Sequence, residues 1–246
     1  MKYLAATFIA ILSLCTYPAQ AWDLSLGAGA YVEKSPYNGV GWETIPMPVI
    51  QFDSQYVFFE IQAGGIYLHK GENSVFVLFA EYMPLSYDAE RSDHAAMDYI
   101  TDRDATIMAG ARYSAWGRFG LVKFEYLYDV FGESDGSRAR LAYGLYFPVA
   151  GLDILPEIGV LWHSECYNDY YFGISGAEAA ASGYVAFEGE DSFTPYATLA
   201  LQYKFTEHFK MLTSITYSDL PDEVVDSPLT GVDYGFSVMA GLAYIF

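Results

Sequence analysis

The chain has 246 residues and a formal net charge of −19, and 53% of its residues are hydrophobic and 18% aromatic. This excess of acid argues against nucleic acid or anionic lipid as binding partners, because both are themselves negatively charged. Past the N-terminus no stretch reaches the run of about 18 apolar residues that a transmembrane helix needs, whereas 23 tyrosines are typical of the aromatic girdles of membrane β-barrels.

The N-terminus is organised like a secretory signal peptide. It carries its one charge at Lys2, an apolar core from Leu4 to Cys15, and an A-x-A cleavage site at Ala19-Gln20-Ala21. The apolar core is too short for a spanning helix. We therefore expect residues 1–21 to be removed as a signal peptide and residues 22–246 to form a single domain.

Beyond Trp22 the chain repeatedly alternates apolar with polar or small residues, and this period of two indicates β-strands. Most of these runs have about 9–13 residues, the length of a strand that crosses a bilayer at a tilt. Gly64-Gly65 is interpreted as a tight turn or a kink. The predicted strands are residues 22–30, 47–52, 56–61, 66–69, 74–82, 105–115, 120–131, 137–148, 154–162, 193–205, 209–217 and 234–246.

The two faces of the predicted strands differ in the way that a membrane barrel requires. In the strand over 120–131, Phe124 and Tyr126 fall on one face, and Lys123 and Glu125 fall on the other. An apolar outside with a charged inside is the inverse of a soluble barrel. We expect the inward charges to pair with one another and fill the lumen, with a selective pore as the alternative. The expected inward charged residues are Arg112, Lys123, Glu125, Asp129, Arg138, Arg140, Glu157, Lys204 and Lys210.

The chain ends on a strand whose apolar face includes Tyr244 and Phe246. This ending resembles the C-terminal signal that outer-membrane barrels present to their assembly machinery. If that end lies in the periplasm, counting strands backwards makes the short turns periplasmic and the three longest loops extracellular, which is the bacterial pattern. The predicted fold is all-β: a transmembrane antiparallel up-and-down β-barrel with short periplasmic turns and long acidic extracellular loops. It has twelve strands if both short strands within 47–61 cross the membrane, and ten if that region is one broken strand or a surface hairpin.

The three longest loops, residues 83–104, 164–192 and 219–233, hold 17 of the 31 acidic residues and only two bases, Arg91 and Arg103. One interpretation is that these loops are simply solvated and repulsive. The functional interpretation is a surface for divalent cations or for basic partners. No D-x-D-x-D-G spacing indicates a defined calcium loop.

No group of residues predicts catalysis. The histidines His69, His94, His163 and His208 form no metal-spaced pair, and the motifs G-x-S-x-G and H-E-x-x-H are absent. Cys166 is the one cysteine left after removal of the signal peptide, so no internal disulfide can form. We expect a protein that is not an enzyme and that has no catalytic, cofactor-binding or metal-binding residues.

The most distinctive stretch is residues 167–183. Ser175 and Glu178 have the spacing of a capping box, and Gly183 can end the short helix over 176–182 that would follow. Including Tyr184, five aromatic rings lie in and around the stretch, and buried rings supply large apolar area. The candidate residues of this segment are Tyr167, Asn168, Asp169, Tyr170, Tyr171, Phe172, Gly173, Ser175, Glu178 and Gly183.

So many rings are unexpected in a merely solvated loop. We therefore expect the segment to fold over or into the extracellular mouth as a plug, with the helix over 176–182 as a cap. Asp169 would then bond to loop backbone or to an inward base such as Arg138 or Arg140. The alternative is a mobile loop whose rings contact only one another.

The same stretch resembles the YNDYYYGVS-AEA-SG pattern of the MltA-interacting protein (MipA/OmpV) family of outer-membrane proteins. Ile45-Pro46-Met47-Pro48, Tyr217-Ser218-Asp219-Leu220 and the terminal Phe246 match as well, so the resemblance covers nearly the whole mature chain. Residues 83–104 match no part of the pattern. The resemblance implies a β-barrel scaffold, because the name-giving member tethers a lytic transglycosylase to a murein synthase. Other members resemble adhesins or stress-responsive surface proteins.

From the resemblance we expect a scaffold or anchor for peptidoglycan remodelling in the outer membrane of a Gram-negative bacterium. Its expected partners are a lytic transglycosylase, a murein synthase, the barrel assembly machinery, outer-membrane lipid and lipopolysaccharide, and nucleic acid is not among them. The alternative function is a surface-binding, adhesin-like protein or a narrow channel that uses the acidic extracellular loops. The family has no established active site, so no catalytic residue is carried over.

Overall fold

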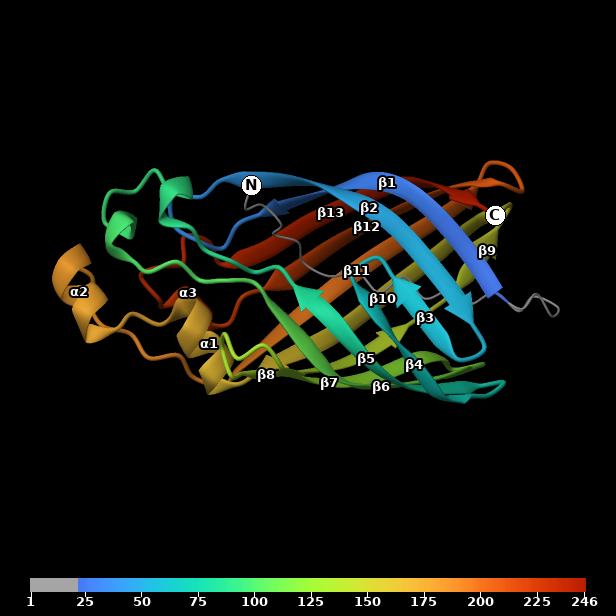
Figure 1. The fold of residues 1–246 in the computed structure, drawn as a ribbon, viewed down its shortest axis with the longest axis horizontal. Coiled ribbons are helices and arrows are strands. Elements are labelled where there is room, and N and C mark those ends of the chain that lie inside the picture. The colour runs from blue at the N-terminus through green and yellow to red at the C-terminus, as the bar shows by residue number, and fades with distance from the viewer. Residues whose placement is uncertain (1–21) are drawn as a thin grey trace.

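The structure is a computed structural model that describes residues 22–246, and the expected signal peptide lies outside these residues. The described chain is an elongated barrel with its helices gathered at one end (Figure 1). Its strands are β1 (Trp22–Lys34), β2 (Trp42–Ser54), β3 (Val57–Glu60), β4 (Ala63–Lys70), β5 (Ser74–Met83), β6 (Thr106–Gly117), β7 (Gly120–Asp129), β8 (Ser137–Gly144), β9 (Phe147–Val149), β10 (Leu152–His163), β11 (Ser192–Lys204), β12 (Phe209–Asp219) and β13 (Tyr234–Ile245).

The strands form one closed antiparallel sheet. Neighbours follow chain order, β13 pairs with β1, and β10 pairs with both β8 and β11. The short β9 continues the line of β8 along β10. Twelve strands therefore surround the lumen in residues 22–246, so the prediction of a twelve-stranded barrel is confirmed and the alternative of ten is wrong.

Strands β3 and β4 are shorter than their neighbours and form a hairpin that turns at Ile61 and Gln62. The predicted turn or kink at Gly64-Gly65 is wrong, since both glycines lie within β4. Gly65 permits close packing instead, because a Cβ there would lie 2.2 Å from the carbonyl oxygen of Leu78 on β5.

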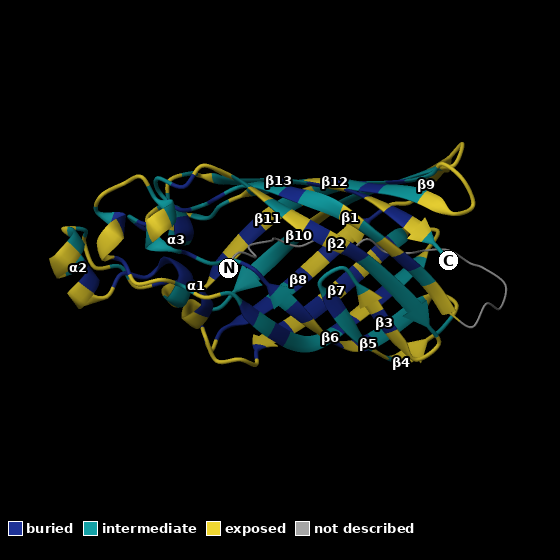
Figure 2. Cartoon of the chain, turned by 45° about the horizontal axis from the view of Figure 1, so that its top comes forward, coloured by how far each residue is buried: buried dark blue, intermediate teal, exposed yellow. Residues whose placement is uncertain are grey.

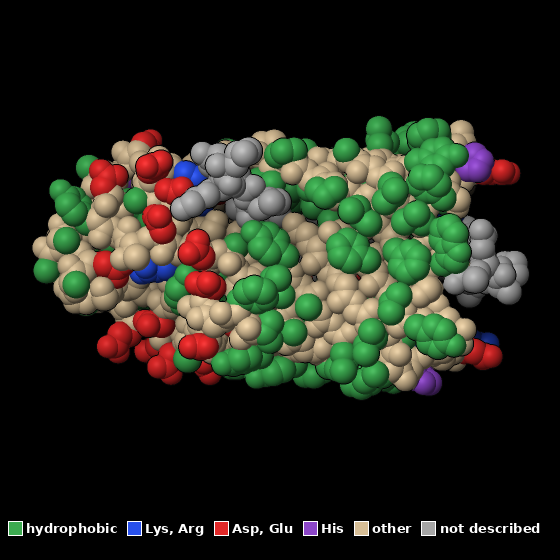
Figure 3. Space-filling view, in the orientation of Figure 1, with side chains coloured by type: hydrophobic (Ala, Val, Ile, Leu, Met, Phe, Trp, Pro, Cys, Tyr) green, Lys and Arg blue, Asp and Glu red, His purple; other side chains and the backbone are tan. Residues whose placement is uncertain are grey.

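The alternation predicted from the sequence is present along the wall of the barrel. On β7, Phe124 and Tyr126 are exposed on the outside, whereas Lys123 and Glu125 are buried inside. Figure 2 shows buried and exposed residues alternating along the strands, and Figure 3 shows hydrophobic side chains spread over the outer wall. The outer wall is therefore apolar, as strands that face lipid require.

The two ends of the barrel differ. The end with short connections, here called the turn end, carries both Trp22 and the C-terminus, since Ser25 pairs with Ile245 there. The opposite end, here called the loop end, carries the long acidic connections. No helix within residues 22–246 is long and apolar enough to cross a membrane. The helices of the loop end are α1 (Glu165–Phe172), α2 (Gly176–Ser182) and α3 (Asp222–Val225), with the 3-10 turns η1 (Ala89–Arg91) and η2 (Met97–Tyr99).

Candidate functional site

Charged side chains from the strands meet inside the lumen and form a network, here called the luminal ion cluster. Strand register creates it, because Arg112 of β6, Glu125 of β7 and Arg140 of β8 lie directly opposite one another. Arg112 Nε lies 2.6 Å from Glu125 Oε1, and Arg140 Nε lies 3.3 Å from Glu125 Oε2. The other pairs of the cluster are Arg112–Glu60, Lys123–Glu157 and Arg138–Glu81.

The luminal ion cluster balances its own charge. Among the described residues its ion pairs join four bases to four acids, and the most buried members, Lys123, Glu125 and Glu81, are each 1% exposed. Pairing is what makes such burial tolerable, because an unpaired buried charge is strongly destabilising. The prediction that inward charges pair across the lumen is confirmed for these residues. Asp129 differs, since its carboxylate accepts hydrogen bonds from Thr106 and from Ser134.

Toward the loop end, apolar side chains of the wall and of the loops form one continuous core. Met108 and Leu127 of the wall belong to the same cluster as Tyr37, Met97 and Tyr171 of the connections, and none of the five is more than 2% exposed. The ring of Tyr37 also packs against another loop, since its centroid lies 5.0 Å from the ring centroid of Tyr87. The loops are thus packed onto the barrel and not merely attached to it.

Helix α1 lies in the mouth of the barrel. It begins after Ser164, whose hydroxyl accepts a hydrogen bond from the Tyr167 N–H (3.4 Å). Its buried residues are Tyr167, Asn168, Tyr171 and Phe172. The Asn168 amide donates to the hydroxyl at the start of β11 (2.8 Å), and the Tyr171 hydroxyl donates to a backbone carbonyl of the β5–β6 connection (3.2 Å). Helix α1 is therefore fixed on one side to the wall and on the other to a second loop.

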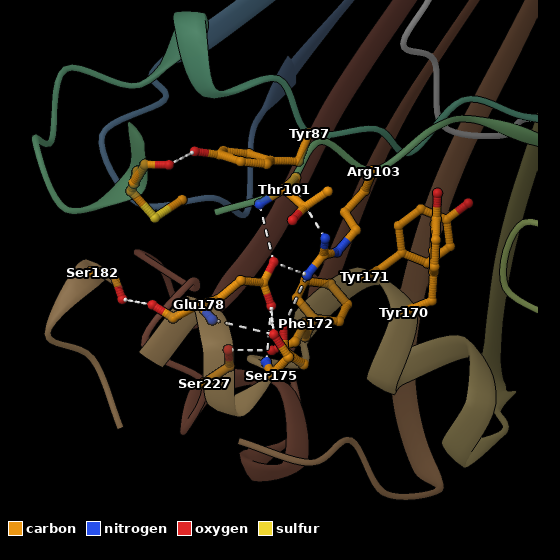
Figure 4. A network of polar contacts seen from close by, with 12 residues as sticks. Tyr87, Thr101, Arg103, Tyr170, Tyr171, Phe172, Ser175, Glu178, Ser182 and Ser227 are labelled. Carbon is orange, nitrogen blue, oxygen red and sulfur yellow. Dashed lines mark hydrogen bonds and ion pairs between the residues drawn. The ribbon is translucent and has the colours of Figure 1, made fainter. Parts of the chain in front are cut away.

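Glu178 joins α2 to the connection that precedes β6 (Figure 4). One carboxylate oxygen accepts from the Ser175 N–H (2.8 Å) and hydroxyl (2.7 Å), and the other accepts from the Thr101 N–H and from Arg103 Nη2, both at 3.0 Å. Burial opposes the charged form, but hydrogen bonds from Ser175 and Thr101 and the charge of Arg103 together lower the pKa of Glu178 to about 2. Glu178 therefore stays ionised and ties two acidic loops together.

The predicted segment 167–183 has the local structure that its sequence indicated. Helix α2 has the predicted bounds, both hydrogen bonds of the capping box form, and Gly183 ends the helix at φ 79°. Asp169 accepts a hydrogen bond from the Gly189 N–H (3.0 Å), which is the expected bond to loop backbone. The helix in the mouth is α1, however, and α2 lies farther from the barrel (Figure 1).

Two features of the loops were missed. Helix α1 had a recognisable start, because Ser164 is a good N-cap and Glu165 places an acid in the first turn. The partnership of Arg103 with Glu178 had no signal, because 75 residues separate the two in the chain.

The remaining predicted residues lie at the two ends. Acidic side chains gather at the loop end (Figure 3), yet within residues 22–246 no three His, Cys, Asp or Glu side chains are grouped so as to hold a metal ion. Cys166 is exposed at that end. Tyr244 and Phe246, the predicted assembly signal, are exposed at the turn end with their ring centroids 4.9 Å apart.

A closed sheet with an apolar outer wall, a lumen crossed by paired charges and long loops at one end defines a transmembrane β-barrel of the outer-membrane class. The family model described as MltA-interacting protein MipA matches residues 26–246. The chain therefore belongs to the MipA family, and it is an outer-membrane protein. Because bacterial outer-membrane barrels have short periplasmic turns and longer extracellular loops, we interpret the loop end as extracellular and the turn end as periplasmic.

Relatives of known name agree with this assignment. The chain is 33% identical to a putative outer membrane protein YiaT of Escherichia coli over 228 residues, which cover 93% of each chain. It is 32% identical to the MltA-interacting protein of Escherichia coli over 222 residues, which cover 90% of each chain. It is also similar to the translocator domain of autotransporter NalP from Neisseria meningitidis, with a TM-score of 0.48 and 12% identity over 94% of this chain and 90% of that one.

Proposed function

We propose that this protein is a non-enzymatic outer-membrane scaffold that anchors peptidoglycan-remodelling proteins. The observation that carries the proposal is the luminal ion cluster, whose paired charges cross the lumen, together with helix α1, which buries Tyr167, Tyr171 and Phe172 at the mouth. A barrel closed in this way acts through its exposed ends. A relative named MltA-interacting protein supports a lytic transglycosylase as one partner, and the family resemblance suggests a murein synthase as a second.

The partners of such a scaffold lie in the periplasm, so they must contact the turn end. The connections there are short, which limits the docking surface to the turns and the barrel rim. Exposed residues that belong to four different turns are Gln55, Glu72, Arg118 and Glu207. A photoreactive amino acid at each of these positions samples most of the rim.

The proposal is tested by photo-crosslinking in living cells from Gln55, Glu72, Arg118 and Glu207, with the captured proteins identified by mass spectrometry. We expect adducts with peptidoglycan-cleaving or peptidoglycan-synthesising proteins from one or more of these positions. Matched control positions are Asp98 and Val185, which are also exposed but lie at the loop end. Adducts with such proteins should not form from the controls, and their absence from all four turn positions would refute the scaffold.

A surface-binding function of the loop end is the second candidate, and the gathering of acidic side chains there favours it (Figure 3). The partner would be basic, because opposite charges steer association. Replacing Glu188, Glu190 and Asp191 by amides removes charge from three exposed positions. Lower binding of intact cells to a basic surface after this change, with unchanged crosslinks at the turn end, would support this second function.

Two roles of the predicted site residues also stay proposals. We propose that residues 167–183 act as the plug of the mouth, supported by the burial of Tyr167, Tyr171 and Phe172. The terminal Tyr244 and Phe246 are proposed to be read by the barrel assembly machinery. Removal of both terminal rings should lower the amount of folded protein in the outer membrane, which heat-modifiable gel migration measures.

A further inference from the structure

The wall of the barrel is interrupted beside β2, along the loop-end half of that strand. The β3–β4 hairpin lies beside only the turn-end half of β2, since β2 pairs with β3 from Gln51 to Asp53 and no farther. Figure 1 shows the hairpin ending well short of the loop-end tip of β2, whereas β4 runs along β5 up to Glu81, two residues before β5 ends. A cavity of about 550 Å³ lies at this interruption. We call it the wall notch, and its lining includes Met47, Pro48, Phe59, Ala80, Glu81 and Ile107.

Two prolines of β2, Pro46 and Pro48, lie where the strand lacks a neighbour. Successive residues of a strand direct their backbone groups to opposite sides. The Ile50 carbonyl accepts from the Ile61 N–H (2.8 Å), so Pro48 and Pro46 direct their backbone groups to that same side, into the wall notch. Proline has no N–H, and the two donors that would be orphaned there are therefore missing from the chain.

On the opposite side the same rule holds just past the end of β5, which ends at Met83. The Tyr82 N–H of β5 donates to the Gln62 carbonyl (3.0 Å) at the tip of the hairpin. The next residue of the same parity is Pro84, which again lacks a donor. Pro48 thus lines the wall notch, and Pro46 on β2 and Pro84 just past β5 are the next residues of the same parity, so none of the three has an N–H to offer a further strand.

The missing N–H groups disfavour a β-strand as the molecule that occupies the wall notch. A strand from a partner or from a second copy of the chain would add to a sheet edge through main-chain N–H and C=O groups, and Pro46 and Pro48 remove half of them. The wall notch also opens on the outer wall, beside the exposed Phe59 and Leu78, where the surrounding medium is hydrocarbon. Its volume lies in the range of sites that hold small apolar molecules, roughly 300–1,000 Å³. We propose that the wall notch binds a hydrocarbon chain of an outer-leaflet lipid.

The inner end of the wall notch is closed by a buried ion pair. Glu81, which is 1% exposed, lines the cavity and accepts from Arg138 Nη2 (2.6 Å). A hydrocarbon chain in the wall notch therefore reaches Met47 and Ile61 but is stopped before the lumen by the luminal ion cluster. The wall notch is therefore a binding site for a lipid chain and not a lateral pore.

The test uses the full protein in phosphatidylcholine vesicles doped with a phosphatidylcholine whose acyl chain carries a diazirine. After photolysis, labelled residues are mapped by mass spectrometry. We expect labelling of Met47 and Ile61 at a level comparable with the lipid-facing Leu242, and several-fold above Leu212 and Met239. The last two residues are the matched comparison, because they belong to the same buried cluster as Met47 but do not line the cavity, and they are 0% and 1% exposed. Labelling of Met47 and Ile61 no higher than that of Leu212 would overturn the proposal.

A variant that fills the wall notch gives an independent arm. Ala80→Phe places a ring in the cavity, whereas Ala240→Phe adds the same ring to an exposed alanine of β13. Ala80→Phe should lower the labelling of Met47 and Ile61 several-fold, and Ala240→Phe should not. Heat-modifiable gel migration verifies that both variants are folded. Unchanged labelling in folded Ala80→Phe would overturn the proposal.

The competing occupant, a second copy of the chain, is tested with Pro48→Cys in a Cys166→Ser background. A disulfide-linked dimer through position 48 in vesicles would assign the wall notch to a dimer contact and overturn the lipid assignment. We expect the oxidised variant to remain monomeric while the wild-type labelling pattern is retained.

Discussion

Glu125→Gln tests whether the luminal ion cluster stabilises the barrel. Glu125 is 1% exposed and is the partner of both Arg112 (2.6 Å) and Arg140 (3.3 Å). The amide keeps the shape of the side chain but leaves two buried guanidinium groups short of counter-charge. Removing one partner of a buried ion pair costs about 3–5 kcal/mol. Because Arg112 keeps Glu60 at 3.4 Å, we expect the lower end of that range, about 3 kcal/mol in the free energy of unfolding.

The assay is urea unfolding in phosphatidylcholine vesicles, followed by tryptophan fluorescence and by gel migration with and without heating. Glu207→Gln is the matched control, because Glu207 lies exposed in a turn and its change should stay within about 0.5 kcal/mol. The double variant Glu125→Gln/Arg140→Met should lose less than the sum of the single variants, since contacting residues do not act additively. A loss below about 1 kcal/mol for Glu125→Gln, or strict additivity, would refute the reasoning.

Three further outcomes are expected. Leu199→Arg, on the outer wall, should cost roughly 2–4 kcal/mol of unfolding free energy and Thr198→Arg less, because Thr198 faces inward onto Thr216; the reverse order would show that the register is wrong. The pKa of Glu178 is lower in the folded protein than the usual value of about 4.3, so its contribution to stability is complete above that pH and is lost as pH falls toward about 2. Protease resistance of the β5–β6 connection should therefore fall over that interval, and should fall less in Glu178→Gln. Deletion of residues 168–182 should raise ion conductance in planar bilayers, and unchanged conductance would show that the luminal ion cluster alone closes the lumen.

The features that the sequence predicted correctly are those set by local chemistry. The strand predicted over 193–205 is β11, Ser192–Lys204. A strict period of two places all its apolar side chains on one face only when the segment is a strand. Helix α2 followed the prediction because Ser175, Glu178 and Gly183 satisfy the ends of a short helix within their own sequence. Neither prediction needed knowledge of the rest of the chain.

The features that were missed depend on closure of the barrel. The turn at Ile61 and Gln62 carries no Gly or Pro, and Ile61 has φ 50°, a conformation that β-branched residues rarely adopt. Its position is set by pairing with β2 and β5 on both sides, which no local pattern reveals. Likewise, Arg103 and Glu178 meet only because two loops fold over the same mouth.

The wall notch and the luminal ion cluster are two parts of one arrangement. The short hairpin leaves the loop-end half of β2 without a sheet neighbour, and in lipid every backbone donor left without a partner costs several kcal/mol. Pro46 and Pro48 avoid that cost on β2 by having no donor to satisfy. Opening the wall would also expose the lumen to lipid, but Glu81 is held by Arg138 at the inner end. A barrel built in this way can interrupt its wall without becoming a pore. The prolines leave no unpaired N–H on the edge of β2, and the Glu81–Arg138 ion pair separates the interruption from the lumen.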